Sequence, residues 1–351
     1  MTGYERAYRL LRHQEADRVA VFDSYWQETI QRWQSEGLAE GTDLGKEFGH
    51  DVALFGFDMT LGFPEEVLGE DERTVTVRGA YGMTERRWKS QSGPPQMLGT
   101  VIGDRASWDE HKHRLEPSER RMPRGSADAF RSCFEDKGRF CCFSALDPYE
   151  HAWRYFGVEN LLIAMAAEPD LAAEVFDTSA ELILAMARRY DELGIELHGC
   201  WLWGDIAYRN APLFSPDAYR RLLQPAHKKI YDHFRSRDLP CVYHTDGDIR
   251  VLIPDLMEAG VTCLHPLEAK AGLDVRKLKG EYGDDLAFFG NIDIRVMGGT
   301  REEIEEEVRS KLSVAKVGGG YLYHSDHSVP PSVSLDNYRF VLEMVGVYGR
   351  Y

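Results

Sequence analysis

The segment LPCVYHTDGD, residues 239–248, decides how the rest of the sequence is interpreted. Its apolar, β-branched and aromatic residues 241–243 are typical of a buried strand. His244, Asp246 and Asp248 follow, and such polar side chains do not continue into a core without partners. We therefore expect the strand to leave the core at His244 and to turn its last residues toward a cavity.

The same arrangement, a short apolar run followed by polar residues, recurs along the chain. Eight runs are expected to form strands, at residues 18–23, 51–57, 140–144, 197–203, 241–243, 261–264, 286–289 and 320–323. Helices are expected between most of them, at residues 4–15, 26–36, 150–166, 169–192, 249–258, 301–316 and 334–347. Apolar strands that alternate with helices indicate a parallel sheet, and eight strands fit a closed (β/α)8 TIM barrel better than an open sheet. We expect residues 1–351 to form this one α/β barrel domain.

Residues 74–88 depart from this rhythm. Their sequence, TVTVRGAYGMTERRW, alternates with a period of two around a glycine-containing turn. This pattern predicts a β-hairpin near residues 74–92, inserted into the barrel.

The composition excludes several classes of protein. The net charge of -16 and the pI of about 5.2 argue against binding to nucleic acids or to anionic membranes, which require basic surfaces. The six cysteines include no CxxC pair, so neither a zinc ribbon nor a redox motif is indicated. The charged N-terminus does not read as a signal peptide, and no apolar run approaches the roughly 18 residues of a membrane span. We expect a soluble, cytoplasmic protein that acts on a small molecule.

Polar side chains gather at the expected C-terminal ends of the strands, where barrel enzymes have their active sites. This rim contains Asp58, Asp147, Trp203, Asp205, His244, Asp246, His265, Glu268, Asn291, Asp293, His324, Asp326 and His327. Trp203 follows Trp201 on one strand, so we expect one of these rings in the core and the other at the mouth. Tyr25 and Trp26, after the first strand, could line a pocket or pack against helices.

Three interpretations of this rim stay open. The first is a metal site, because two imidazoles and a carboxylate commonly bind zinc, and His244, His327 and either Glu268 or Asp246 could supply them. The second is metal-free acid–base catalysis, in which His327 or His244 moves protons and Asp205 or Asp246 orients it. In the third, these groups bind one another and backbone amides and simply close the top of the barrel.

Four segments resemble the uroporphyrinogen decarboxylase superfamily, which includes the decarboxylase of haem synthesis and the zinc-dependent, corrinoid-linked methyltransferases. They are GD with LFSP in residues 204–216, HTDG at 244–247, FGNID at 289–293, and GGYL with DHSVP in 319–330. The resemblance spans nearly the whole chain and is clearest over residues 147–347. It implies a (β/α)8 barrel, and it makes a homodimer an expectation.

The resemblance argues against uroporphyrinogen as the substrate. The decarboxylases carry a Pro-x-Trp-x-Met-Arg-Gln-Ala-Gly-Arg type segment after the first strand, and its arginines hold the acidic side chains of the porphyrinogen. The corresponding segment here, VAVFDSYWQET at residues 19–29, has no arginine, and Asp23 and Glu28 would repel such a substrate. In favour of the decarboxylases, His327 matches a histidine that they place near the substrate, and Asp58 resembles their central aspartate.

The methyltransferases bind zinc through a His-x-Cys…Cys set. His244 matches the first ligand, Asp246 stands at the first cysteine position, and His327 stands near the second. A nitrogen and oxygen set would suit polarisation of an ether or hydroxyl oxygen, or of a bound water. We therefore predict zinc ligands at His244, Glu268 and His327, and catalytic roles for Asp205, Asp246 and His327.

These implications favour a methyltransferase of the demethylating type. It would move a methyl group from a small methoxylated or methylated compound to a corrinoid on a partner protein, because no DxHxxG-type cobalamin loop is found in the sequence. The predicted substrate-binding residues are Tyr25, Asp58, Trp203, Tyr208 and Asn291. A metal-free decarboxylase or lyase acting on a small organic acid is the alternative, and a non-enzymatic small-molecule sensor is a third possibility.

Overall fold

The computed structural model describes residues 1–90 and 95–351, so residues 91 and 92 of the predicted hairpin lie outside the described residues. Eight parallel strands form one sheet in the order β1-β14-β13-β12-β11-β8-β7-β2. Their bounds are β1 (Ala20–Val21), β2 (Val52–Phe55), β7 (Phe140–Leu146), β8 (Gly199–Trp203), β11 (Cys241–His244), β12 (Cys263–His265), β13 (Ala287–Phe289) and β14 (Tyr321–Tyr323). Each barrel strand from β2 onward pairs with the next along the chain, and β14 returns to β1. The predicted (β/α)8 barrel is confirmed.

Asp51 joins the two strands at the seam of the barrel. Its backbone N–H donates to the carbonyl of Val21 at 2.7 Å, and its carboxylate accepts the N–H of Val21 at 2.8 Å. Arg6 and Arg18 both pair with this carboxylate. Because Asp51 is buried, these two guanidinium groups supply the partners that a buried charge requires.

Side chains that alternate along the strands fill the two sides of the barrel wall. Val242 belongs to the cluster inside the barrel, whereas Cys241 and Tyr243 belong to the cluster between the barrel and its helices. The interior cluster is built from Ala20, Val52, Phe140, Cys142, Trp201, Val242, Cys263, Ala287, Phe289 and Leu322. Helix α1 (Gly3–Leu10) adds Ala7 and Leu10 to it. The interior is therefore a packed apolar core.

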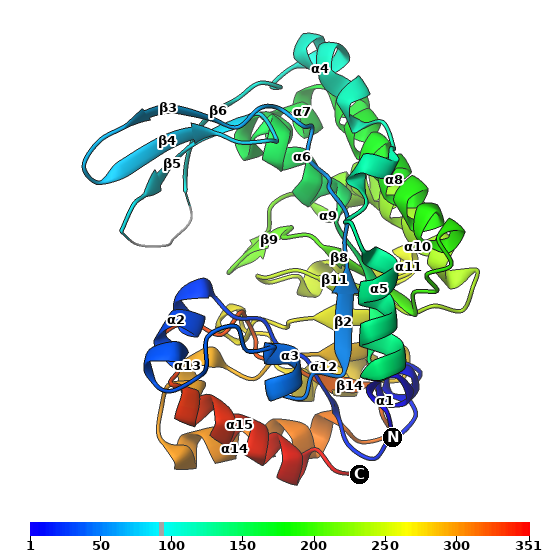
Figure 1. Cartoon of the computed structure of the whole chain (residues 1–351). Helices are drawn as coiled ribbons and strands as arrows, with labels where there is room; N and C mark the ends of the chain where they lie inside the picture. Colours follow the sequence, from blue (N-terminus) through cyan, green and yellow to red (C-terminus); the bar gives the residue numbers. More distant parts are fainter. Residues whose placement is uncertain (91–94) are drawn as a thin grey trace.

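Helices surround this barrel (Figure 1). Their bounds are α2 (Gln27–Ser35), α3 (Leu44–Glu47), α4 (Arg105–His111), α5 (Ser126–Arg131), α6 (Pro148–Phe156), α7 (Val158–Ala167), α8 (Pro169–Glu192), α9 (Pro216–Ala218), α10 (Gln224–Arg235), α11 (Ile253–Ala259), α12 (Val275–Tyr282), α13 (Ile294–Met297), α14 (Arg301–Ala315) and α15 (Leu335–Tyr348). The single helix predicted at 150–166 is instead two helices. They meet at Gly157, whose φ of 83° is a conformation that favours glycine and breaks the helix. Short strands β9 (Ala207–Tyr208) and β10 (Ala211–Pro212) form a small hairpin after β8.

The insertion is larger than the predicted hairpin. Strands β4 (Thr74–Arg78) and β5 (Met83–Trp88) pair as expected, but β3 (Glu66–Glu70) and β6 (Gln96–Thr100) extend them to a four-stranded antiparallel sheet. The added strands were missed because both contain glycine, both pair through a register shift, and neither has a buried face. This sheet projects from the barrel beside α6 and α7 (Figure 1).

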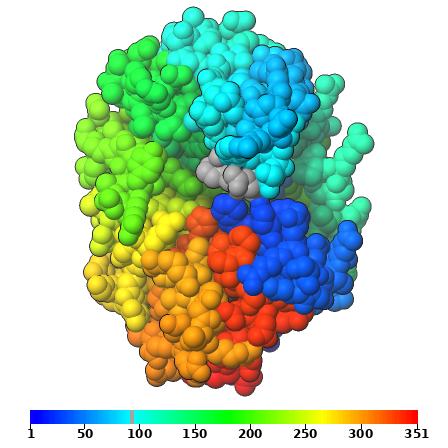
Figure 2. Space-filling model, turned by 90° about the vertical axis from the view of Figure 1, so that its left-hand side faces the viewer, coloured from blue at the N-terminus to red at the C-terminus, as the bar shows by residue number. Residues whose placement is uncertain are grey.

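The side of the molecule that carries β9 and α2 is turned toward the viewer in Figure 2. In this view the insertion lies above the N-terminal and C-terminal segments (Figure 2). Within the described residues, no helix is long and apolar enough to cross a membrane.

Candidate functional site

A layer of rings lies at the C-terminal end of the barrel interior. Alternate residues of a strand face the same side, so each ring follows an interior residue of its strand by two positions. The four rings are those of Trp203, His244, His265 and His324. The ring centroids of His244 and Trp203 are 4.6 Å apart, and those of His265 and His324 are 4.2 Å apart. The same period of two, applied to the sequence, identifies His265 and His324 as members of this layer, although only Trp203 and His244 were chosen as site residues.

Burial favours the neutral form of these imidazoles. It lowers the pKa of His244 to about 4 and lowers the pKa values of His265 and His324 as well, and neighbouring imidazoles add to the effect. The Nδ1 atoms of His244 and His265 are 2.7 Å apart, so one of them donates to the other. A proton on Nδ1 of His244 leaves its Nε2 with a lone pair, which a metal ligand requires.

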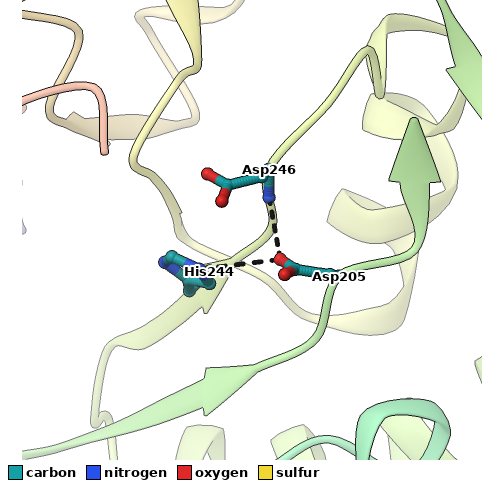
Figure 3. Close-up of side chains that lie close together, drawn as sticks. All are labelled: Asp205, His244 and Asp246. Carbon is teal, nitrogen blue, oxygen red and sulfur yellow. Dashed lines mark hydrogen bonds and ion pairs between the residues drawn. The ribbon is translucent and has the colours of Figure 1, made fainter. Parts of the chain in front are cut away.

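Asp205 and Asp246 complete a compact group with His244. Oδ1 of Asp205 lies 3.6 Å from Nε2 of His244 and accepts the backbone N–H of Asp246 at 3.0 Å (Figure 3). One ligand atom of each residue lies within 4.8 Å of the other two. We call Asp205, His244 and Asp246 the rim cluster. His244 is the last residue of β11, and Asp205 and Asp246 lie on the loops that follow β8 and β11.

Asp246 has an electrostatic environment that a cation would relieve. Its burial, together with the carboxylates of Asp205 and Glu268, raises its pKa well above the ordinary value. Its Oδ1 atom is buried and has no hydrogen-bond partner among the described residues. An orphaned buried acceptor costs free energy, and bound metal is one of the partners that would satisfy it.

The donor set of the rim cluster fits a divalent metal ion. Zinc is bound in proteins by a neutral imidazole nitrogen and by carboxylate oxygens, and both are present. The cluster unites His244, a predicted ligand, with Asp205 and Asp246, which were predicted as catalytic residues.

The other two predicted ligands lie outside this cluster. The carboxylate of Glu268 accepts the backbone N–H of Gly247 at 2.8 Å and pairs with Lys270 at 2.6 Å. His327 lies 3.4 Å from Asp246, and its ring stacks on Trp26 at 6.1 Å. Glu268 thus fixes the loop that carries Asp246, and His327 borders the rim cluster.

The five predicted substrate-binding residues are scattered. Trp203 contacts the rim cluster through His244, and its indole N–H donates to Ser144. Asn291 is fully buried and binds three backbone groups, and the hydroxyl of Tyr25 binds an imidazole and another phenol. Asp58 closes an exposed turn, and 68% of Tyr208 is exposed. The structure therefore brings only Trp203 of this set to the rim cluster.

A second group of polar residues lies on the outer side of the barrel wall. Oδ2 of Asp147 accepts from Nε2 of His227 and from the hydroxyl of Tyr243, both at 2.9 Å. Nδ1 of His227 lies 3.0 Å from the hydroxyl of Tyr219. A Cβ atom at Gly204 would lie 2.3 Å from the Asp147 carboxylate, so only glycine fits beside it, next to Asp205. We call Asp147, His227 and Tyr243 the buried network.

A cavity of about 360 Å³ opens beside the rim cluster. It is lined by Leu146, Glu150, Arg154, Trp203, Gly204, Asp205 and His244. Burial raises the pKa of Glu150 to about 7, against the opposing effect of Arg154. Both residues come from α6, one turn apart, and were not predicted; the position of Glu150 shortly after the end of β7 was a signal for that residue, whereas Arg154 lies one helical turn further on.

A larger hollow of about 450 Å³ lies at the opposite end of the barrel. Tyr4, His198 and Arg237 are among its lining residues. They belong to α1 and to the segments that enter the strands. Because (β/α)8 enzymes place their chemistry at the C-terminal ends of the strands, the smaller cavity is the candidate active site.

Comparisons with known proteins agree with this architecture. The sequence profile of the family described as Uroporphyrinogen decarboxylase (URO-D) matches residues 152–348. The uroporphyrinogen decarboxylase of Streptomyces avermitilis is 28% identical over 191 residues, which cover 53% of this chain and 50% of that protein. The enzyme of the same name from Chlorobium limicola is 24% identical over 212 residues, covering 55% and 57%. The chain thus spans about half the length of the curated relatives it matches.

The chain is similar over nearly its full length to a solved methyltransferase from Methanosarcina mazei. The match covers 99% of each chain with a TM-score of 0.69. At 14% sequence identity, this similarity establishes a shared fold.

Proposed function

Because this chain belongs to the uroporphyrinogen decarboxylase family, we propose that it is an enzyme whose site is the rim cluster: a metal-dependent methyltransferase of the demethylating type. It would move a methyl group from a small methoxylated or methylated compound to a corrinoid carried by a partner protein. The solved structure similar over its whole length is named a methyltransferase, which supports this choice within the family.

The rim cluster is the observation that carries the proposal. Three ligand atoms of suitable chemistry lie within 4.8 Å of one another, and one carboxylate oxygen of Asp246 is buried without a partner. In the buried network, by contrast, both oxygens of the Asp147 carboxylate accept hydrogen bonds. A metal bound there would act as a Lewis acid on a substrate oxygen.

The chain's own residues would perform the remaining tasks. Asp205 and His244 would hold the metal, and Asp246 would complete the set. His327 lies 3.4 Å from Asp246 and is half-buried, so it can exchange a proton with that carboxylate or with a substrate group. The ring of Trp203 would form part of the apolar wall of the cavity.

The same geometry argues against an octa-acidic porphyrinogen. Asp23, in the arginine-free segment, is buried and accepts hydrogen bonds from the hydroxyls of Tyr323, Ser325 and Tyr338. This segment is thus bound internally. It supplies no cation for acidic side chains.

Methyl transfer to free cob(I)alamin tests the proposal directly. Zinc-loaded protein is mixed with cob(I)alamin and a panel of methoxylated aromatic compounds, and methylcobalamin is followed by its absorbance. We expect methylcobalamin with zinc-loaded protein and none after chelation or in His244→Ala. Steady demethylation by His244→Ala, or no transfer from any compound of the panel, would contradict the proposal.

A metal-free decarboxylase or lyase acting on a small organic acid is the second candidate. Two observations favour it: the curated relatives reported above are decarboxylases, and the raised pKa of Asp246 makes this carboxyl a proton donor. Release of CO2 from a small organic acid, fully retained after exhaustive chelation, would move this candidate to first place.

A further inference from the structure

The cavity beside the rim cluster has two chemically different ends. His244 and Asp205 of the rim cluster line one part of it, and Glu150 and Arg154 of α6 line another. Between them, Leu146 and Trp203 supply apolar surface. A molecule that fills this volume therefore meets the rim cluster with one group, an apolar wall with its body, and α6 with another group.

Among the described residues that line this cavity, Arg154 has the only cationic side chain. Its Nη2 donates to Oε1 of Glu150 at 2.6 Å, and its guanidinium lies over the ring of Trp153, 4.9 Å from the centroid. Its Nε atom is buried and has no hydrogen-bond partner in the described part of the chain. A guanidinium has five N–H groups; one of them is bonded to Glu150 and the N–H of Nε is buried, so three N–H groups on the two Nη atoms are left for a ligand.

Glu150 compensates this cation only in part. Its other carboxylate oxygen accepts the indole N–H of Trp153 at 2.7 Å, and the side chain is buried. Burial holds its pKa at about 7, so a fraction of Glu150 is protonated at neutral pH. The stacked, bonded guanidinium is thus held in a fixed plane, which is the arrangement that favours two-point binding of a carboxylate.

We propose that Arg154 binds the carboxylate of the substrate, so that the substrate class is a small carboxylic acid with an apolar body. Its other end carries the group that reaches the rim cluster. Asp205 and the ionised fraction of Glu150 line the same cavity, and their negative charge disfavours a doubly charged phosphate relative to a singly charged carboxylate. This inference rests on the proposed function for what happens at the rim cluster, but it assigns a separate recognition point.

Two probes of nearly equal shape test the assignment. Isothermal titration calorimetry measures 4-methoxybenzoate and the neutral 4-methoxybenzamide binding to zinc-loaded, untagged protein. We expect the carboxylate to bind at least tenfold more tightly than the amide. Arg154→Gln is expected to remove this preference. Arg154→Lys keeps the positive charge but loses the paired N–H donors of the guanidinium, so it is expected to retain part of the preference.

Arg220→Gln is the matched control. This arginine also pairs with a carboxylate, Asp255, at 2.7 Å, but it does not line the cavity. The control is expected to keep the full preference, and circular dichroism checks that each variant is folded. Equal binding of the two probes, binding of neither, or an intact preference in Arg154→Gln would overturn the inference.

Zinc content measured on the same samples separates the two proposals. Zinc-loaded protein without the carboxylate preference defeats the inference alone. An Arg154-dependent preference in protein that binds no zinc defeats the metal proposal and leaves the carboxylate assignment standing.

Discussion

Two histidine–carboxylate groups lie on opposite sides of strand β11. In the buried network, His227 and Asp147 are 2.9 Å apart and neither side chain is exposed. In the rim cluster, His244 and Asp205 are 3.6 Å apart, and half of the Asp205 side chain is exposed. Tyr243 and His244 are adjacent in the sequence, and the alternation of the strand sends one side chain to each group.

The difference lies in how completely the acceptors are satisfied. Oδ1 of Asp147 caps α6 through the N–H of Glu150, and Oδ2 accepts two side-chain donors. Oδ1 of Asp246 has none among the described residues. A fully satisfied group fixes the fold, whereas an unpartnered carboxylate oxygen beside other metal-ligating atoms can accept a bound cation. The predictions below test this distinction.

The largest expected effect is on stability, from Asp147→Ala. The substitution leaves Nε2 of His227 buried without an acceptor, removes one of the two acceptors near the Tyr243 hydroxyl and removes a helix cap, so the free energy of unfolding should fall by about 3–5 kcal/mol. Asp246→Ala, in metal-free protein, should cost less than about 1 kcal/mol, because Oδ1 has no donor among the described residues and Oδ2 has only His327, at 3.4 Å. Urea unfolding followed by circular dichroism measures both. A larger loss in Asp246→Ala than in Asp147→Ala would reverse the assignment.

The second effect is a pH dependence of the free energy of unfolding that is caused by Glu150. Its folded pKa of about 7 is raised from an ordinary value of 4.5, so the folded state binds this proton more tightly than the unfolded state. The corresponding stability is present below pH 4.5 and is lost as the pH rises to about 7, on the order of 3 kcal/mol in total. Unfolding titrations from pH 4 to 8 should show this decline in the wild type relative to Glu150→Gln. A difference in the free energy of unfolding between wild type and Glu150→Gln that stays constant from pH 4 to 8 would contradict the expectation.

The third effect connects the two groups through Gly204. The hydroxyl of Tyr243 also lies 3.0 Å from the carbonyl oxygen of Gly204, the residue before Asp205. Tyr243→Phe should therefore weaken zinc binding by roughly tenfold, as changes behind a metal ligand commonly do. Tyr231→Phe is the control, because that buried hydroxyl has no hydrogen-bond partner among the described residues. Competition with a zinc chelator measures both affinities, and equal losses would show that only packing matters.

The smallest effect concerns Tyr208. Its side chain is mostly exposed, so Tyr208→Ala should change the free energy of unfolding by less than about 0.5 kcal/mol. If Tyr208 contacts substrate as predicted, KM should rise while stability is unchanged. An unchanged KM would remove this residue from the substrate-binding set.

The barrel could be predicted because each strand is apolar on both sides and ends in polar residues. The period of two also correctly indicates which side chains share a face, as for Trp201 in the core and Trp203 at the mouth. The exposed strands β3 and β6 have no such pattern, so the size of the insertion could not be predicted from the sequence.

The composition of the site was harder to predict than its location. Distances between loops decide which rim residues meet, and no local pattern shows that the backbone amide of Gly247 binds Glu268. For the same reason, Asp147 was placed at the rim, although its carboxylate turns outward to His227. Residues of α6, such as Arg154, reach the cavity from a helix rather than from a strand end.

Metal content of the untagged protein tests the central claim most directly. Mass spectrometry of acid-digested samples should find close to one zinc ion per chain in the wild type and in His233→Ala, a histidine of α10 outside the rim cluster. His244→Ala should lose the metal while remaining folded. Absence of metal from well-folded wild-type protein, or retention of zinc by His244→Ala, would contradict the assignment of the rim cluster as a metal site.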